Sequence, residues 1–240
     1  MKQIKLVADL HVHTVSSGHA YSTIEEYAAC AKKIGLKAIA ITDHGPKMPG
    51  GPHHYHFSNL RMVPDVIDGV RIYKGVEANI IDEDGGLDLT DDVLKDLDIV
   101  MAAFHPRVGY ESRGEEINTK VLIKVMKNPY VNIIAHPGNP MYPVNVKETV
   151  SEAKKRGIVL EINNSSFTGS RTGSWERCLQ FAKEVKKRDW LVTVGSDSHI
   201  SMMLATFDKA LELTGLAGLK DKSIVNSSLS LIEKHLVERK

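Results

Sequence analysis

The chain has little of what marks nucleic-acid-binding and membrane proteins. Aromatic residues make up only 6% of its 240 residues, which leaves little for a groove that stacks bases. Its 31 basic and 30 acidic residues nearly cancel, so the net charge of +1 creates no basic field. No apolar run approaches the roughly 18 residues that span a bilayer. We therefore expect neither nucleic acid nor a membrane among its partners.

Cysteines are also scarce, and neither of the usual glycine-rich nucleotide-binding motifs occurs. Cys30 and Cys178 fall in separate helix-like stretches and form neither a disulfide framework nor a CxxC zinc motif. We expect both to be buried thiols. Asp9 and His11 interrupt the first apolar stretch, so no signal peptide is predicted and the cytoplasm is the expected location. The sequence is compatible with a homo-oligomer.

Short apolar runs alternate regularly with helical patterns along the whole chain. Strands are predicted at 4–8, 37–42, 70–77, 98–104, 131–135, 158–163 and 190–195. Helices are predicted at 22–34, 58–68, 91–97, 115–127, 145–156, 175–188, 203–214 and 227–238. Ser22 and Glu25 indicate a capping box at the start of the first helix, and Gly35 indicates its end.

This alternation predicts a parallel sheet with right-handed crossovers. In an open sheet the strand ends would lie along a wide line, whereas in a barrel they all point to one face. Titratable side chains follow nearly every predicted strand, so a shared site favours the barrel. We predict an α/β fold of the TIM-like barrel class, with outer helices and a single domain over residues 1–240.

The titratable side chains at the strand ends are mostly histidines. His11 and His13 alternate along one strand and therefore share a face. Glu77 lies in an otherwise apolar stretch, where a buried charge needs a partner, and a metal ion is an effective one. The candidate metal ligands are His11, His13, His19, His44, Glu77, His105, His136, Asp197 and His199. Such a nitrogen-rich set suits zinc, iron or manganese better than magnesium or calcium.

Two aspartates and one loop accompany these ligands. Asp9 and Asp43 stand just before ligand histidines, and neighbouring residues of a strand face opposite sides. We therefore expect them to support ligand imidazoles rather than to bind the ions. The histidine-rich loop at 52–56 could line a substrate pocket, contact a metal or lie in solvent.

Together, the motifs resemble the PHP (polymerase and histidinol phosphatase) family. The resemblance rests on segments 9–14, 42–44, 75–77 and 195–199 and on the strand-end His105 and His136. Segments 52–56, 136–140 and 161–166 further resemble its YcdX-like phosphatase group. Membership implies a distorted (βα)7 barrel that holds three divalent metal ions, usually zinc, with manganese or iron in some members.

The resemblance also implies how the ligands divide among the ions. His11, His13, Glu77 and Asp197 would hold the first ion. Glu77 would bridge to a second ion, completed by His105 and His136. His19, His44 and His199 would hold the third.

Such a centre would favour a small phosphate monoester. Three divalent ions and two carboxylates leave a charge of about +4, which attracts a polyanion. A hydroxide bridging two ions, held by Glu77, His11, His13 and Asp197, would attack phosphorus in line. Candidate contacts to the substrate are Arg171, Arg107, Arg61, His54 and His56, since arginine matches phosphate oxygens.

The leading hypothesis is therefore a metal-dependent phosphomonoesterase acting on small phosphorylated substrates. Three alternatives remain open. They are a histidinol-phosphate phosphatase, a phosphodiesterase or exonuclease, and a metal-stabilised interaction domain without catalysis.

Overall fold

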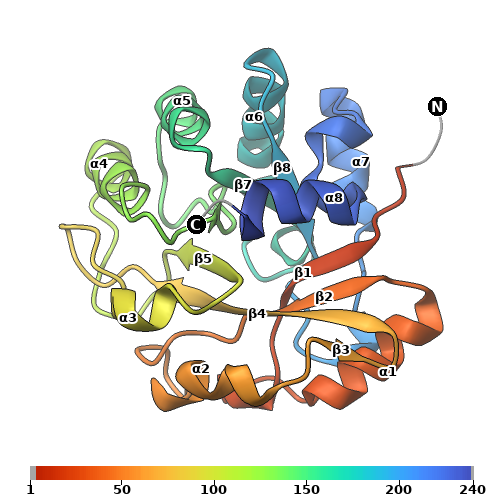
Figure 1. Cartoon of the computed structure of the whole chain (residues 1–240). Coiled ribbons are helices and arrows are strands. Elements are labelled where there is room, and N and C mark those ends of the chain that lie inside the picture. The colour runs from red at the N-terminus through yellow and green to blue at the C-terminus, as the bar shows by residue number, and fades with distance from the viewer. Residues whose placement is uncertain (1–3, 239–240) are drawn as a thin grey trace.

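The computed structural model describes residues 4–238 and shows a nearly closed barrel of parallel strands (Figure 1). The strands pair in the order β1 (Ala8–Val12), β2 (Ala38–Ile41), β4 (Val70–Asn79), β5 (Ile99–Ala103), β6 (Ile133–Ile134), β7 (Val159–Asn163) and β8 (Val192–Gly195). Every pair along this path is parallel. The predicted distorted barrel of seven parallel strands is therefore confirmed.

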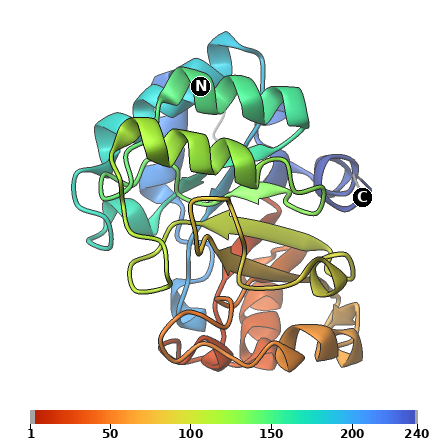
Figure 2. The same cartoon turned by 90° about the vertical axis from the view of Figure 1, so that its left-hand side faces the viewer.

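Helices surround the strands, as the alternating pattern predicts. The longer ones are α1 (Ile24–Ile34), α4 (Glu115–Val125), α5 (Val146–Arg156), α6 (Ser174–Lys187) and α7 (Asp208–Ala217), and α3 is a short turn at Asp91–Leu94. Figure 2 shows α4 and α5 on one side of the strands and the early helical segments on the other. Within residues 4–238, no helix is both long and apolar enough to cross a bilayer.

The prediction of a helix at 58–68 is wrong. Helix α2 (Tyr55–Asn59) ends early, and β3 (Val66–Ile67) instead pairs antiparallel with the start of β4. Asp68 and Gly69 form the turn, both with positive φ, 53° and 80°. An Asp-Gly pair is a strong signal for a two-residue hairpin, and the sequence prediction did not use it.

The start of α1 is displaced by one residue from the prediction. Thr23 caps the helix and exchanges hydrogen bonds with Glu26, so the capping box is not at Ser22 and Glu25. The Ser22 hydroxyl donates to Ser201 instead. The predicted end at Gly35 is confirmed, because Gly35 adopts the left-handed conformation and closes the helix.

The two cysteines differ in burial. Cys178 is buried, as predicted, and burial raises the pKa of its thiol to about 12. Cys30 is only partly buried, because it lies on the outer helix α1, where its thiol contacts the Ser201 carbonyl oxygen. The prediction that both thiols are buried is therefore wrong for Cys30.

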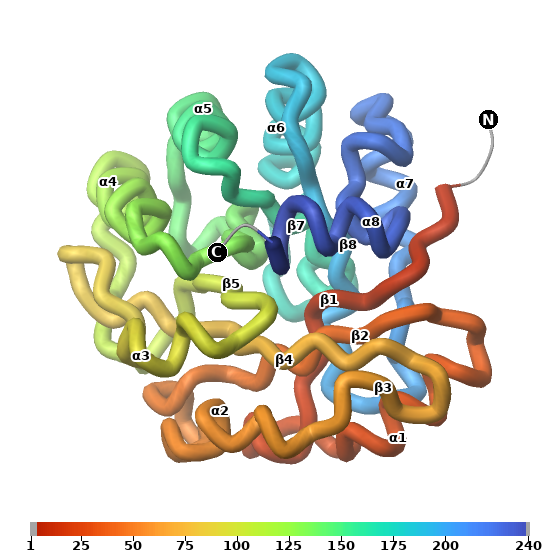
Figure 3. The backbone as a smooth tube through the Cα atoms, viewed as in Figure 1, coloured from red at the N-terminus to blue at the C-terminus, as the bar shows by residue number. Residues whose placement is uncertain are grey.

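The barrel interior is closed at one end by the last helix. Small and branched side chains from the strands, among them Ala8, Ile99 and Ile133, pack with Ile232 and Leu236. Those two residues belong to α8 (Leu229–Ile232) and the π-helical turn that follows it, Glu233–Val237. Figure 3 shows this segment lying across the strands. Apolar side chains of this segment thus fill one end of the barrel, and the opposite end is left for a site.

The seam between β8 and β1 is held by a buried asparagine rather than by a regular ladder. The Asn226 amide donates to the carbonyl oxygens of Ala8 and Val194, at 2.9 and 2.8 Å. Its oxygen accepts from the Val194 amide and the Thr193 hydroxyl. Towards the other end, His13 N–H donates to the Ser198 carbonyl oxygen. Asn226 therefore replaces strand pairing where the barrel would otherwise open.

Removing this side chain should destabilise the fold. Asn226→Ala leaves buried backbone groups of two strands unpaired, which we expect to cost roughly 2–4 kcal/mol of the free energy of unfolding. Urea denaturation followed by circular dichroism measures this cost. Ser227→Ala is the control, because that hydroxyl donates only to the exposed turn carbonyl of Asp221. Equal stability of the two variants would contradict the role of Asn226.

Candidate metal centre

A bulge in β1 turns His11 into the barrel, beside His13, which directly follows the strand. Ala8 pairs with Ala38 and Val12 pairs with Ile41, so one extra residue lies in β1 between these pairs. The strand runs from Ala8 to Val12, four residues later than predicted, and therefore includes His11. A bulge changes which side chains face inward, and here His11 points into the barrel as His13 does. The expected shared face is thus present.

Two other strand ends carry strained backbone. His136 and Asp197 have positive φ, 32° and 57°. Such conformations are unfavourable for residues other than glycine and persist only where surrounding contacts impose them. At Asp197 the amide donates to the His11 carbonyl oxygen at 3.1 Å. At His136 the amide donates to Glu161 at 2.9 Å. Both bonds aim the side chains at the common centre.

Glu77 lies at the middle of this centre and is fully buried. Its Oε1 lies 2.7 Å from Nε2 of His136 and 3.4 Å from Nε2 of His105. Its Oε2 lies 2.8 Å from Nδ1 of His44 and 3.4 Å from Nε2 of His11. The two oxygens of one carboxylate therefore face two separate sets of imidazoles, as the implied bridging role requires.

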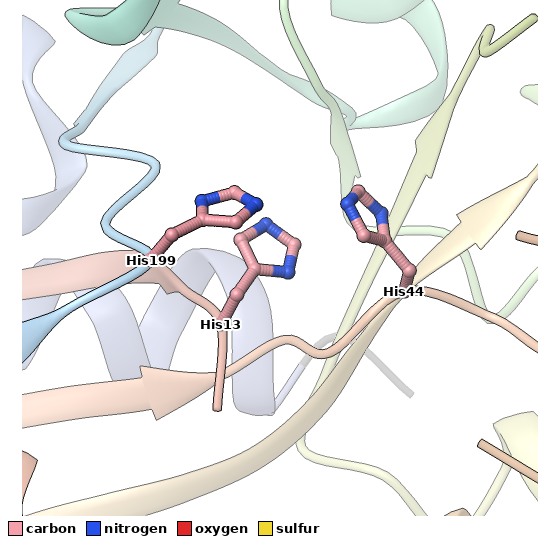
Figure 4. Close-up of side chains that lie close together, drawn as sticks. All are labelled: His13, His44 and His199. Carbon is pink, nitrogen blue, oxygen red and sulfur yellow. The ribbon is translucent and has the colours of Figure 1, made fainter. Parts of the chain in front are cut away.

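Three overlapping groups of side chains place their ligand atoms within 4.8 Å of one another. They are His11 with His13 and Asp197, His44 with Glu77 and His105, and His13 with His44 and His199. Figure 4 shows the ring of His13 between those of His44 and His199. The grouping overlaps that implied by the resemblance but differs in detail, since His44 also approaches Glu77 and His13 also approaches His199.

The remaining candidate ligands lie beside these groups. His136 contacts Glu77, as described above. His19 is exposed, and its ring centre lies 5.0 Å from those of His44 and His199. All nine candidate ligands therefore gather at the carboxyl ends of the strands. Seven of them are buried, His199 is partly exposed and His19 is exposed.

The donor atoms fit a metal ion. His44 Nδ1, His105 Nε2 and Glu77 Oε2 are buried without a hydrogen bond of ordinary geometry among the described residues, although His44 Nδ1 lies 2.8 Å from Glu77 Oε2. These three residues form one of the groups above. A buried polar atom without a partner is costly, and a cation bound among these atoms would satisfy all three. A purely structural cluster would leave this cost uncompensated.

The protonation states of several ligands also suit a metal. Burial opposes charge on Glu77, but His105, His11 and His44 outweigh it and lower the pKa of its carboxyl well below the usual value. Burial lowers the pKa of His105 to about 4. Burial and the nearby His44 lower the pKa of His13 as well. An ionised carboxylate and neutral imidazoles are the forms that coordinate metal.

His11 differs because carboxylates surround it. Burial alone would lower the pKa of its imidazole, but Glu161, Asp197 and Glu77 reverse this and raise it well above 6.5. A proton on His11 balances part of their negative charge. A divalent cation would supply that positive charge instead, and the proton would then leave.

Hydrogen bonds fix which nitrogen of several imidazoles faces the centre. His13 Nδ1 lies 3.2 Å from the Ser17 hydroxyl, which donates to Asp43 at 2.7 Å. His105 Nδ1 lies 2.8 Å from Oδ1 of Asn79. With Nδ1 as the N–H that donates outward, Nε2 is left free for an ion.

The two expected supporting aspartates act differently. Asp43 supports His13 through Ser17 and also accepts from the amide and hydroxyl of Thr14, as expected of a supporting residue. Asp9 does not hold an imidazole. It accepts from the backbone amides of His11, Ser196 and Ala205 and so fixes the loop that carries Asp197. Burial raises the pKa of Asp9 to about 6, partly offset by these bonds.

Glu161 is a buried acid of the site that the list of candidate ligands does not include. Its Oε1 lies 2.7 Å from Nδ1 of His11, and its Oε2 accepts from the His136 amide. A Cβ at Gly195 would lie 2.1 Å from that Oε1, so only glycine fits there. The signal was a lone acid between Leu160 and Ile162 in a predicted strand, the same signal that identified Glu77.

Only one candidate arginine reaches the cluster. Arg171 Nη1 lies 3.1 Å from Oδ2 of Asp197 and 3.4 Å from the Ser166 hydroxyl. Arg107 is exposed and makes no ion pair within residues 4–238. Arg61 lines a different cavity, together with Lys74 and Asp98, which contains no candidate ligand. The structure thus gives Arg61 no position near the metal centre.

The two candidate contacts in the histidine-rich loop at 52–56 also differ in position. His56 Nε2 lies 3.3 Å from Oδ2 of Asp43, at the edge of the site. His54 is exposed, and its ring is tilted against that of His53, with ring centres 3.9 Å apart. Of the two predicted substrate contacts in this loop, only His56 is therefore brought next to a residue that supports a ligand.

Full-length relatives share nearly half of the sequence. A probable phosphatase of Thermoanaerobacter sp. (strain X514) is 49% identical over 237 residues, which cover 99% of this chain and 97% of the relative. A probable phosphatase of Caldanaerobacter subterraneus subsp. tengcongensis is 48% identical and covers 99% and 94%.

The fold is shared with more distant proteins. Histidinol phosphate phosphatase from Lactococcus lactis, solved as a complex with zinc, L-histidinol and phosphate, aligns with a TM-score of 0.65. It is 18% identical, and the alignment covers 89% of this chain and 94% of that one. At this identity the likeness concerns the fold.

A family model that matches most of the chain shows the family to which the chain belongs. The model of the PHP domain matches residues 9–187, which begin just before His11 and include Glu77, His105, His136 and Glu161. With full-length relatives at nearly half identity, this confirms the resemblance carried by the strand-end motifs. The chain belongs to the PHP domain family.

Proposed function

We propose that the chain is a phosphomonoesterase acting on small phosphate esters at a centre of three divalent ions of the zinc type. The enzyme class, a phosphatase, is confirmed by the full-length relatives of that name. The observation that carries the finer proposal is the position of Glu77, whose two oxygens face separate sets of imidazoles. The proposed ligands are the nine residues that gather around it, His19 included.

The ions and the protein have separate roles in this proposal. When bound, the ions supply Lewis acidity toward phosphate and lower the pKa of coordinated water toward ~7, which provides the nucleophile. Glu161 holds His11 in one orientation, and Asn79 does the same for His105. Asn163 donates to both Glu161 and Asp197 at 3.2 Å, which keeps these acids in place without adding charge.

The charge of the centre supports a phosphate substrate. With Glu161 counted beside Glu77 and Asp197, three divalent ions leave a net charge of about +3. This is lower than two carboxylates alone would give, yet it still favours a dianionic monoester over a neutral ester or amide. Arg171 adds a positive charge at the edge, where its fork can contact phosphate oxygens beyond Asp197.

Two other reactions that the same centre could catalyse, hydrolysis of a histidinol ester and of a phosphodiester, must be compared with hydrolysis of other monoesters. The histidinol phosphate phosphatase of similar fold contains zinc, histidinol and phosphate in its structure, and a histidinol ester is therefore one substrate to compare. A phosphodiester is the other, because it carries one negative charge fewer per phosphorus than a monoester. Retained metal without turnover of any phosphate ester would instead indicate an interaction domain.

Hydrolysis of p-nitrophenyl phosphate and of bis-p-nitrophenyl phosphate tests this proposal. We expect metal-replete protein to prefer the monoester. The double substitution His11→Ala with His13→Ala removes two donors from one group and should lower kcat by at least about 10³-fold. Metal content by elemental analysis and far-ultraviolet circular dichroism accompany the assay.

The control for this variant is His235→Ala. His235 lies in the turn that closes the opposite end of the barrel, so its loss removes an imidazole without touching the centre. Monoesterase activity should remain at the wild-type level in this control. A double variant with wild-type turnover would refute the metal-dependent mechanism, and a preference for the diester would refute the monoesterase assignment.

Glu161 should tune the centre without binding an ion. Glu161→Gln keeps the size of the side chain but removes the charge that orients the His11 imidazole, so metal affinity should fall about 10–100-fold. Competition with a chromophoric chelator measures that affinity. Glu176→Gln, at an exposed position of α6, is the matched control and should change nothing. Affinities equal to wild type in both variants would show that Glu161 does not orient His11.

A further inference from the structure

A cavity of about 350 Å³ opens directly beside the metal centre. It shares Asp197 and His199 with the candidate ligands, so a phosphate bound at the centre would extend its alcohol group into this space. Most of the other lining residues carry hydroxyl groups. They are Ser165, Thr168, Ser170, Ser196, Ser198 and Thr206.

Several polar groups of the lining have hydrogen-bonding capacity to spare. Asn164 is 2% exposed. Its side-chain oxygen accepts from the Ala210 amide, while its Nδ2 donates to no described residue. The Thr206 hydroxyl likewise has no hydrogen bond within residues 4–238. The Ser196 hydroxyl is buried without a hydrogen bond of ordinary geometry, although its proximity helps to lower the pKa of Asp9. The Asn164 amide and the partly exposed hydroxyl of Thr206 are therefore free to form hydrogen bonds with a ligand in place of water.

The hydroxyl-bearing turn is held in shape before any ligand arrives. Thr168 and Ser170 both donate to the Ser165 carbonyl oxygen, and the Ser165 hydroxyl donates to Ser170. Arg171 donates to Ser170 as well. The Ser170 hydroxyl oxygen thus accepts twice, whereas the hydroxyl oxygens of Ser165 and Thr168 keep acceptor capacity, so the turn presents these two as fixed neutral acceptors.

The same lining disfavours other kinds of alcohol group. Apart from the candidate ligand His199, none of the described lining residues is aromatic or basic. A nucleobase would therefore find no stacking partner other than a ligand imidazole, and no lysine or arginine lines the cavity to hold a second phosphate. A cationic amine would need a free carboxylate, but Asp197 Oδ2 already accepts from Arg171 and Asn163. Neutral hydroxyl groups, which both donate and accept, match the serines, threonines and the asparagine.

We infer that the substrate is a phosphate monoester of a small, uncharged, polyhydroxylated alcohol, namely a sugar or polyol phosphate. The inference rests on the proposed function and specifies its substrate class. Sites that hydrogen-bond a substrate hydroxyl discriminate strongly against analogues that lack it, because their own polar groups are then left unpaired. Specificity thus comes from the cavity and not from the ions.

A substrate panel with metal-replete protein tests the inference. The panel contains glucose 6-phosphate, ribose 5-phosphate, glycerol 3-phosphate, histidinol phosphate, adenosine monophosphate and p-nitrophenyl phosphate. At least one sugar or polyol ester should exceed both histidinol phosphate and the nucleotide in kcat/KM by about tenfold or more. A preference for histidinol phosphate or for the nucleotide would overturn the inference.

The isosteric substitution Thr206→Val examines the cavity itself. It should raise KM for the preferred sugar or polyol ester about 5–10-fold, and raise KM for p-nitrophenyl phosphate distinctly less, because the latter offers no hydroxyl to Thr206. Thr149→Val is the matched control, since the buried Thr149 hydroxyl on α5 also lacks a hydrogen bond but lies outside the cavity lining. An equal change of KM for both esters, or no change for either, would contradict a pocket that binds the hydroxyl groups of the substrate.

Binding provides a readout that does not require turnover. Saturation-transfer NMR with the metal-replete protein and glucose, ribose or glycerol, whichever is the alcohol of the preferred ester, should give a signal that weakens in Thr206→Val and persists in Thr149→Val. Absence of that signal in the wild-type protein would count against the cavity as the recognition site. Failure to hydrolyse p-nitrophenyl phosphate would overturn the proposed function, and this inference with it, whatever the binding experiment shows.

Discussion

The structure depends on one buried carboxylate. Glu77 is fully enclosed in the barrel, and imidazoles approach both of its oxygens. An ionised group in such a place must be paired, because the loss of hydration is costly. Neutral imidazoles cannot supply the missing positive charge, and a proton on His11 supplies only part of it. Metal ions bound between Glu77 and the imidazoles would complete the balance, which accounts for the gathering of imidazoles and carboxylates at the strand ends.

The rest of the barrel stabilises backbone conformations at the site that are unfavourable on their own. The bulge in β1 and the positive φ of His136 and Asp197 are unfavourable in isolation. Buried acids stabilise them through backbone bonds, Glu161 at His136 and Asp9 at the loop before Asp197. Both acids contact main chain far away in the sequence. The site is therefore rigid because its supporting hydrogen bonds join separate strands.

What could be predicted from the sequence depended on local signals. The ligand histidines were recognisable because parallel strands end at one face, and Glu77 because an acid interrupted an apolar run. Glu161 carried the same signal but stood within its strand rather than at the exit, where ligands were expected. The hairpin at Asp68 and Gly69 was local too and was overlooked. The contacts of Asp9 with Ser196 and Ala205 join residues 187 and 196 positions apart, which no local pattern encodes.

In the proposed site, affinity for phosphate and selectivity for the alcohol come from different parts of the structure, the charged centre and the neighbouring cavity. A cationic cluster binds any accessible phosphate, because the Coulomb attraction depends on charge and hardly on the alcohol attached. Discrimination must then come from groups that contact the alcohol, and the nearest such groups are neutral hydroxyls and one amide. Neutral hydrogen bonds are weak individually, but leaving buried ones unpaired is costly. A hydroxyl-rich lining beside a strongly charged centre is therefore a consistent way to make a general phosphate-binding cluster selective.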